Sequence, residues 1–162
     1  MTPCRRSNNN LTNLDLLLWA ASCICTVAKT PPQVILSTRR MKRVLVVDDQ
    51  SDCSEPMARL LKLCGFDAQT AANGREALDK LHLWAADLVL LDLMMPIMDG
   101  FAFLEAIRGE PRWSGLPVIV FSAWDNETTR DRLQRLGVAS TYRKADTDFD
   151  TMVSQIKQLV GG

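Results

Sequence analysis

The residues that decide the fold are Leu88-Val89-Leu90-Leu91-Asp92-Leu93-Met94-Met95-Pro96-Ile97-Met98-Asp99-Gly100. Four apolar residues lead directly into an aspartate, and a proline and an Asp-Gly pair follow. An apolar run with no polar alternation is typical of a strand buried on both faces, as in a parallel sheet. A carboxylate at the end of such a strand lies at the edge of the sheet where open α/β folds carry their chemistry. Asp92 is therefore the centre of the candidate site.

Strand-like and helix-like patterns alternate from residue 41 onward. Apolar or β-branched runs predict strands at 44–47, 66–70, 88–91, 117–121 and 139–143. Apolar residues at helical spacing predict helices near 51–64, 73–81, 101–107, 125–136 and 149–160. Strands joined by helices run parallel, and right-handed crossovers place helices on both faces of the sheet. The sequence therefore predicts an α/β fold with a five-stranded parallel sheet.

Local signals set the expected faces and ends of these helices. The first helix is expected to bury an apolar face made of Cys53, Met57, Leu60, Leu61 and Cys64. Gly65 is placed to end this helix. Asn73 begins a pattern that resembles a capping box, and Asp125 is placed to cap the fourth helix. The Asp99-Gly100 pair is expected to be a structural turn that starts the third helix.

Residues 1–40 differ in composition from the rest of the chain. They hold 5 of the 19 Lys+Arg and 1 of the 19 Asp+Glu, which leaves 14 basic and 18 acidic side chains in residues 41–162. The apolar run at 16–28 is short for a bilayer span and resembles a signal peptide only weakly. We expect residues 1–40 to be a disordered extension, or sequence upstream of a misplaced start, and residues 41–162 to form the folded domain. A targeting or anchoring role for residues 1–40 is the alternative.

Composition argues against several classes of function for residues 41–162. This part is mildly acidic and has no basic stripe, so we expect no direct contact with nucleic acid, and we expect none with a membrane. The cysteines form no CxxC pair, so neither a zinc site nor a thioredoxin-like motif is indicated. They are Cys4, Cys23, Cys25, Cys53 and Cys64. Reduced thiols in a cytoplasmic protein are the expectation.

Polar side chains follow four of the five predicted strands. Asp48 and Asp49 follow the first strand, Asp92 the third, Ser122 the fourth and Lys144 the fifth. Parallel strands bring these ends to one edge of the sheet. Clustered carboxylates repel one another unless a cation neutralises them, and oxygen-only ligands suit Mg²⁺. A divalent cation beside a carboxylate prepares it to attack a phosphoryl group, so Asp92 is expected to become an acyl phosphate. Lys144 and Ser122 are placed to contact the phosphoryl oxygens.

These motifs carry a resemblance to a known family. The motifs are, in order, Val-Val-Asp48-Asp49, Leu-Leu-Asp92 with Pro96 and Asp99-Gly100, Phe-Ser122-Ala123 and Lys144. Together they resemble the receiver domain of response regulators, the CheY-like family. The resemblance covers nearly all of the folded part and implies a flavodoxin-like sheet in the order 2-1-3-4-5. It also implies that Asp92 accepts a phosphoryl group from the phosphohistidine of a sensor histidine kinase. It implies further that Asp48, Asp49, Asp92 and the backbone carbonyl of Met94 hold Mg²⁺, and that Ser122 and Lys144 read the phosphoryl group.

The sequence departs from the family pattern at two positions. The family usually has a cis-proline after its lysine, whereas Ala145 follows Lys144 here, so the loop is either trans or strained. Thr141 stands where the family often has an aromatic switch residue, and Tyr142 is expected on the opposite face of the strand. The resemblance also implies that the positions of Met94 and Trp124 flank the phosphoryl group and affect water access. Both residues are bulky and apolar here, which predicts slow self-dephosphorylation.

Several functions use the same residues. The first is a stand-alone, single-domain receiver that is not otherwise an enzyme and signals to an unknown downstream protein through a conformational change. Its expected contact surface is the fourth helix, fifth strand and fifth helix, which carry Arg130, Arg132, Arg135 and Arg143. The second is a carrier that passes the phosphoryl group to a histidine phosphotransfer protein. The third is an aspartyl-phosphate enzyme, which Met94 disfavours because such enzymes have a second Asp there. The fourth is a degenerate receiver that acts as a binding module.

Overall fold

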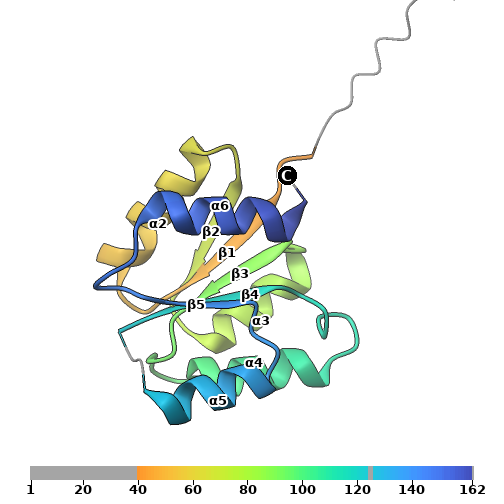
Figure 1. Ribbon diagram of the computed structural model, residues 1–162. Helices are drawn as coiled ribbons and strands as arrows, with labels where there is room; N and C mark the ends of the chain where they lie inside the picture. Colours follow the sequence, from red (N-terminus) through yellow and green to blue (C-terminus); the bar gives the residue numbers. More distant parts are fainter. Residues whose placement is uncertain (1–39, 124–125, 162) are drawn as a thin grey trace, which may run out of the picture. The chain divides into compact units, whose positions relative to one another are not determined.

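The computed structural model describes residues 40–123 and 126–161, in which five strands alternate with five helices (Figure 1). The strands are β1 (Arg43–Val47), β2 (Asp67–Ala71), β3 (Leu88–Leu91), β4 (Val118–Ser122) and β5 (Ser140–Arg143). The helices are α2 (Ser51–Leu63), α3 (Gly74–Leu83), α4 (Gly100–Gly109), α5 (Glu127–Arg135) and α6 (Phe149–Val160). All neighbouring strands are parallel, and their order is β2-β1-β3-β4-β5. The predicted α/β fold and strand order are confirmed.

The two faces of the sheet carry separate cores. Helices α2 and α6 cover one face, and α3, α4 and α5 cover the other (Figure 1). Successive residues of a strand point to opposite faces, and β3 follows this rule: Leu88 and Leu90 join the α2/α6 core, while Val89 and Leu91 join the other. All four are buried, so a continuous apolar run is what this central strand requires.

Several helix ends follow the local signals. The side chain of Asn73 accepts a hydrogen bond from the Glu76 amide, and Gly65 takes a φ of 89° just past the end of α2. Such a positive φ suits glycine because it has no Cβ. Asn126 is the cap of α5, since its side chain accepts from the Thr129 amide. Asp125, which was predicted for that role, lies outside the described residues.

The predicted buried face of α2 is confirmed at Leu61 and in part at Met57, and is wrong at Leu60 and Cys64. The buried residues are Ser54, Ala58 and Leu61, whereas Leu60 is 42% exposed and Cys64 is also exposed. Two adjacent strips of this helix are rich in apolar or small residues, so the pattern alone does not choose between them. Ser54 tolerates burial because its hydroxyl donates to the Gln50 carbonyl. Strands β2, β4 and β5 also begin one residue later than predicted, and β1 begins one residue earlier.

Predictions for the first forty residues fall almost entirely outside the described residues, so a disordered extension remains a prediction. Cys53 and Cys64 are free thiols; the other cysteines lie outside the described residues. Within the described ranges, none of the helices has both the length and the apolar character needed to cross a bilayer. The expected cytoplasmic location is still a prediction.

Candidate functional site

The ends of β1 and β3 bring three carboxylates together. The Asp48 amide donates to the Ala71 carbonyl at 2.9 Å, and the Asp92 amide donates to the Val47 carbonyl at 2.8 Å. These bonds continue the sheet just past its last strand residues and fix both aspartates at one edge. Carboxylate oxygens of Asp48, Asp49 and Asp92 lie within 4.8 Å of one another, with Asp48 and Asp92 buried and Asp49 exposed. The prediction that these side chains meet is therefore correct.

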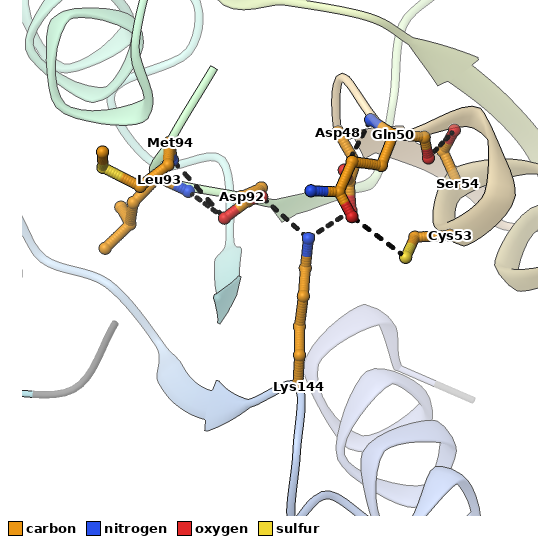
Figure 2. Close-up of polar contacts among 8 residues, drawn as sticks. All are labelled: Asp48, Gln50, Cys53, Ser54, Asp92, Leu93, Met94 and Lys144. Carbon is orange, nitrogen blue, oxygen red and sulfur yellow. Dashed lines mark hydrogen bonds and ion pairs between the residues drawn. The ribbon is translucent and has the colours of Figure 1, made fainter. Parts of the chain in front are cut away.

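Lys144 reaches into this acidic group from the end of β5. Its Nζ lies 2.7 Å from Oδ2 of Asp48 and 2.7 Å from Oδ2 of Asp92 (Figure 2). Burial by itself lowers the pKa of Lys144, but hydrogen bonds and charge attraction from Asp48 and Asp92 outweigh it, so the pKa is raised. Lys144 is therefore held as a cation between two carboxylates.

Backbone amides hold the other oxygens of the two buried aspartates. Oδ1 of Asp92 accepts from the amide of Leu93 at 2.7 Å and, more weakly, from that of Met94 at 3.4 Å (Figure 2). Oδ1 of Asp48 accepts from the amide of Gln50 at 3.0 Å. These contacts were not predicted from the sequence, although an aspartate that accepts from the amide two residues on is a common local turn. They orient both carboxylates without using a further side chain.

The charges and donor atoms of this group fit a divalent cation. Three aspartates face one ammonium, so the cluster keeps an excess of negative charge after Lys144 is counted. Every donor atom in the cluster is a carboxylate oxygen, which is the ligand type that Mg²⁺ prefers. The cluster is thus suited to Mg²⁺, while the ligand role of the Met94 carbonyl stays a prediction.

Ser122 is the last residue of β4 and is fully buried. Its carbonyl accepts a hydrogen bond from the Lys144 amide at 3.1 Å, so the β4 and β5 ends that carry Ser122 and Lys144 are tied together. The predicted role of Ser122 toward a phosphoryl group remains a prediction. Trp124, which was expected to flank the same position, lies outside the described residues.

The two departures from the family pattern have clear structural outcomes. The described residues contain no cis peptide bond, so Lys144 reaches both carboxylates from a trans Lys144–Ala145 loop. Thr141 is exposed and pairs with Val120, which belongs to the core on the α3–α5 face. Tyr142 packs against the core on the α2/α6 face, as expected. The aromatic side chain therefore lies on the other face of β5 from Thr141.

The loop from Asp92 to α4 is tightly anchored at its base. The Gly100 amide donates to the Leu93 carbonyl at 3.0 Å, and a Cβ on Gly100 would lie 2.5 Å from the Asp92 carbonyl. Asp99 caps α4 by accepting from the Ala102 amide, which confirms the predicted structural turn. At the tip, Ile97 has a φ of 69°, and the Met98 amide donates to the Pro96 carbonyl at 2.7 Å. This is a γ-turn, and its backbone costs a β-branched residue about 1–3 kcal/mol.

The fold and the strand-end chemistry define an α/β domain with an acidic pocket at the carboxyl edge of its sheet. Residues 44–157 match the family model described as the response regulator receiver domain. This chain therefore belongs to the family of response regulator receiver domains, the receivers of two-component systems. Receiver domains of this family bind Mg²⁺ in an acidic pocket and interact with sensor histidine kinases.

Individual relatives agree with this assignment. The transcriptional regulatory protein CpxR homolog of Haemophilus influenzae is 37% identical over 120 residues, which cover 74% of this chain and 51% of that protein. The chain thus spans about 51% of the length of this curated relative. A response regulator receiver protein from Pseudomonas putida has a similar structure, with a TM-score of 0.69, 28% identity, and coverage of 73% of this chain and 97% of that one. The Vibrio cholerae chemotaxis protein CheY4 gives a TM-score of 0.68 at 26% identity, with 74% and 98% covered.

Proposed function

We propose that this protein is a response regulator that accepts a phosphoryl group on Asp92 from a phosphohistidine of a sensor histidine kinase. The observation that carries the proposal is the ammonium group of Lys144, which pairs with two buried carboxylates. Lys144 holds the buried carboxylates of Asp48 and Asp92 at 2.7 Å each, and Asp49 lies beside them. The geometry supplies a carboxylate nucleophile, a fixed positive charge and an oxygen-rich cation site at one edge of the sheet.

The transfer forms a bond between an Asp92 oxygen and phosphorus and breaks the nitrogen–phosphorus bond of the donor. The electron pair of that bond returns to the imidazole, which leaves as a neutral ring when its other nitrogen carries a proton. Mg²⁺, when bound, screens the negative charges of nucleophile and phosphoryl group. Lys144 pairs with a phosphoryl oxygen after it releases the Asp92 carboxylate, and Ser122 donates a hydrogen bond to another oxygen.

The proposed output is a conformational change that a protein partner reads. Phosphorylation removes one acceptor of Lys144 and adds negatively charged oxygens at the start of the loop that leads to α4. The face formed by α5, β5 and α6 is the proposed contact surface, and we propose that this chain acts as a single-domain receiver. The alternative is a receiver that works with a further domain, because the Haemophilus relative is named a transcriptional regulatory protein and the chain matches about 51% of it.

The test is incubation of the full chain with acetyl phosphate, with and without Mg²⁺, followed by intact mass measurement. We expect a Mg²⁺-dependent gain of one phosphoryl group that is absent in Asp92→Asn. Asp79→Asn is the matched control, since Asp79 is an exposed aspartate on α3. A wild-type chain that gains no phosphoryl group, or an Asp92→Asn chain that still gains one, would contradict the proposal.

A further inference from the structure

A groove lies at the amino edge of the sheet, the edge opposite the one that carries Asp92. It is bounded by the start of β1, the end of α2 and the end of α6. The end of α6 and the start of β1 lie side by side there (Figure 1). The groove has a volume of about 290 Å³, close to the lower end of the range for small-molecule pockets. Its charged and apolar lining residues are Arg40, Lys42, Lys157, Met41, Phe66 and Val160.

The apolar part of the groove is only partly covered by the fold. Phe66 and Val160 belong to the core of the α2/α6 face and are 5% and 8% exposed. Met41, just before β1, is 57% exposed. The groove therefore has a floor supplied by the core and an apolar side chain that water still reaches. A ligand that covers Met41 gains from the burial of this surface.

Three cations surround this apolar surface. Arg40 donates to the Ala85 carbonyl at a long 3.3 Å. In the described part of the chain, neither Lys42 nor Lys157 forms an ion pair with a carboxylate. No acidic residue is among the described residues that line the groove, although residues 41–162 carry 18 acidic and 14 basic side chains. The groove is therefore positively charged within a mildly acidic domain.

The ends of α2 and α6 explain only part of this positive charge. The C-terminal end of a helix carries about half a negative charge, so basic side chains are favourable there without any ligand. Two such ends offset about one of the three cations. About two positive charges are left over at the groove. This excess is complementary to an anion.

We propose that this groove binds a small amphipathic anion of the class of medium-chain carboxylates. The carboxylate pairs with the ammonium groups of Lys42 and Lys157. The alkyl chain covers Met41 and lies against Phe66 and Val160. At about 30 Å³ for each water in the liquid, the groove has room for about ten non-hydrogen atoms, which is the size of octanoate. The site is independent of the proposed function, because it lies at the other end of the strands.

Octanoate is the probe, and two molecules with the same chain length separate charge from apolar contact. The full chain is titrated with octanoate, 1-octanol and octyltrimethylammonium, each below the concentration at which it aggregates, and the amide signals are followed by NMR. We expect octanoate to shift the amides of Met41, Gly65 and Gly161, which line the groove, in a saturable way. The amide of Gly137, which follows α5 on the other face of the sheet, should not shift. Octanol should bind more weakly, and octyltrimethylammonium should not bind.

Two variants test the two halves of the site. The double variant Lys42→Gln, Lys157→Gln removes both charges, and we expect it to raise the Kd for octanoate by roughly tenfold, as for loss of two exposed ion pairs. Its Kd for octanol should not change. Met41→Ser removes exposed apolar surface and should raise the Kd for both probes. The amide spectrum of each variant without probe shows whether it is folded.

Each variant has a matched control that should change neither Kd. Lys62→Gln is the control for charge, because Lys62 is exposed in the last turn of α2 and lines a different groove. Leu83→Ser is the control for Met41→Ser, because Leu83 is 89% exposed at the end of α3.

Several outcomes would overturn the proposed site. The first is the lack of a saturable shift with octanoate, and the second is an equal Kd for all three probes. The third is a double variant that binds octanoate as tightly as wild type or no more weakly than Lys62→Gln. The fourth is a shift of the same amides with rising protein concentration alone, which would place a second copy of the chain in the groove.

Discussion

Helices α4 and α5 start in the same way and are held in different ways. Each comes after a strand with a candidate site residue at its end: Asp92 directly follows β3 before α4, and Ser122 is the last residue of β4 before α5. Each is capped by a side chain, since Asp99 accepts from the Ala102 amide at 2.7 Å and Asn126 from the Thr129 amide at 2.8 Å. However, α4 buries Gly100, Phe103, Leu104 and Ile107, whereas Leu133 is the sole buried residue of α5 in the described part of the chain.

This difference suggests that α4 is part of the rigid scaffold of the domain and that α5 is the helix that moves more easily. A helix with several buried side chains opens only when the core opens, while one with a single buried residue opens at a lower cost. The contacts of α5 lie mostly toward its C-terminal half, at Leu133 and at the turn that follows the helix. Among the described residues of α4 and α5, we therefore expect the start of α5 to cost least to displace. It is also the end that follows Ser122.

The largest expected effect on stability comes from a substitution in α4. Phe103→Ala removes a fully buried aromatic side chain of α4 and leaves a cavity beside β3 and β4. We expect a loss of about 3–5 kcal/mol in the free energy of unfolding. Urea denaturation monitored by circular dichroism measures it. A loss below about 1 kcal/mol would mean that α4 is held no better than α5.

Strand β3 and helix α4 could be predicted from the sequence because the residues that their apolar patterns place inside are the ones that the structure buries. The continuous apolar run of β3 and the spacing of Leu104 and Ile107 predict elements that the core then uses. The meeting of Asp48, Asp92 and Lys144 was likewise predictable, because parallel strands bring their carboxyl ends together. These features depend on local pattern plus topology, and neither requires knowledge of a particular contact.

Other features required contacts that the sequence does not reveal. Two competing apolar strips on α2 left its buried face ambiguous, and Ser54 is buried only because Gln50 accepts its hydroxyl hydrogen. Isoleucine disfavours a positive φ, so the local signal at Ile97 pointed away from the turn it forms. Arg108, in the last turn of α4, resembles any solvated charge in the sequence. Its partners are carbonyls as far as 29 residues away.

Arg108 gives the second prediction, which tests how the end of α5 is held. Its guanidinium donates to the carbonyls of Leu136 at 2.8 Å and Gly137 at 3.1 Å after α5, and to those of Trp113 and Leu116 before β4. Arg108→Met keeps much of the side-chain stem and removes these donors. We expect a loss of about 1–3 kcal/mol in the free energy of unfolding. Amide hydrogen exchange should also become faster at the end of α5.

Arg112→Met is the control for this substitution. Arg112 is exposed in the loop between α4 and β4, and its guanidinium lies 5.7 Å from the ring centre of Trp113. Its loss should stay below about 0.5 kcal/mol, as for ordinary surface changes. Equal losses for Arg108→Met and Arg112→Met would show that the carbonyl contacts do not hold α5.

The third prediction concerns Lys144, which contacts the residues that precede both α4 and α5. Its side chain binds Asp92 before α4, and its amide binds the Ser122 carbonyl before α5. Because the pKa of Lys144 is raised by folding, its stabilisation is complete below its ordinary value of 10.5 and is lost as the pH rises above that value. Only the side-chain contact titrates, so the weakening should appear at Asp92 rather than at Ser122.

The measurement is the free energy of unfolding as a function of pH for wild type and Lys144→Met. The two proteins differ at position 144 alone, so the difference between the two curves isolates the contribution of Lys144. Wild type should show a steeper decline above pH 10.5 than Lys144→Met. Parallel curves would contradict a proton held more tightly by Lys144 in the folded state.

The smallest expected effect compares the two helix caps directly. Loss of a cap costs a helix about 0.5–2 kcal/mol, but the cost reaches the whole molecule only if the helix opens together with the core. Asp99→Ala should therefore lower the urea midpoint, because α4 is part of the core. Asn126→Ala should leave the midpoint nearly unchanged and instead speed amide exchange within the first turn of α5. Equal shifts of the urea midpoint in the two variants would mean that α5 unfolds only with the rest of the domain, and the start of α5 would no longer be the place where a response costs least.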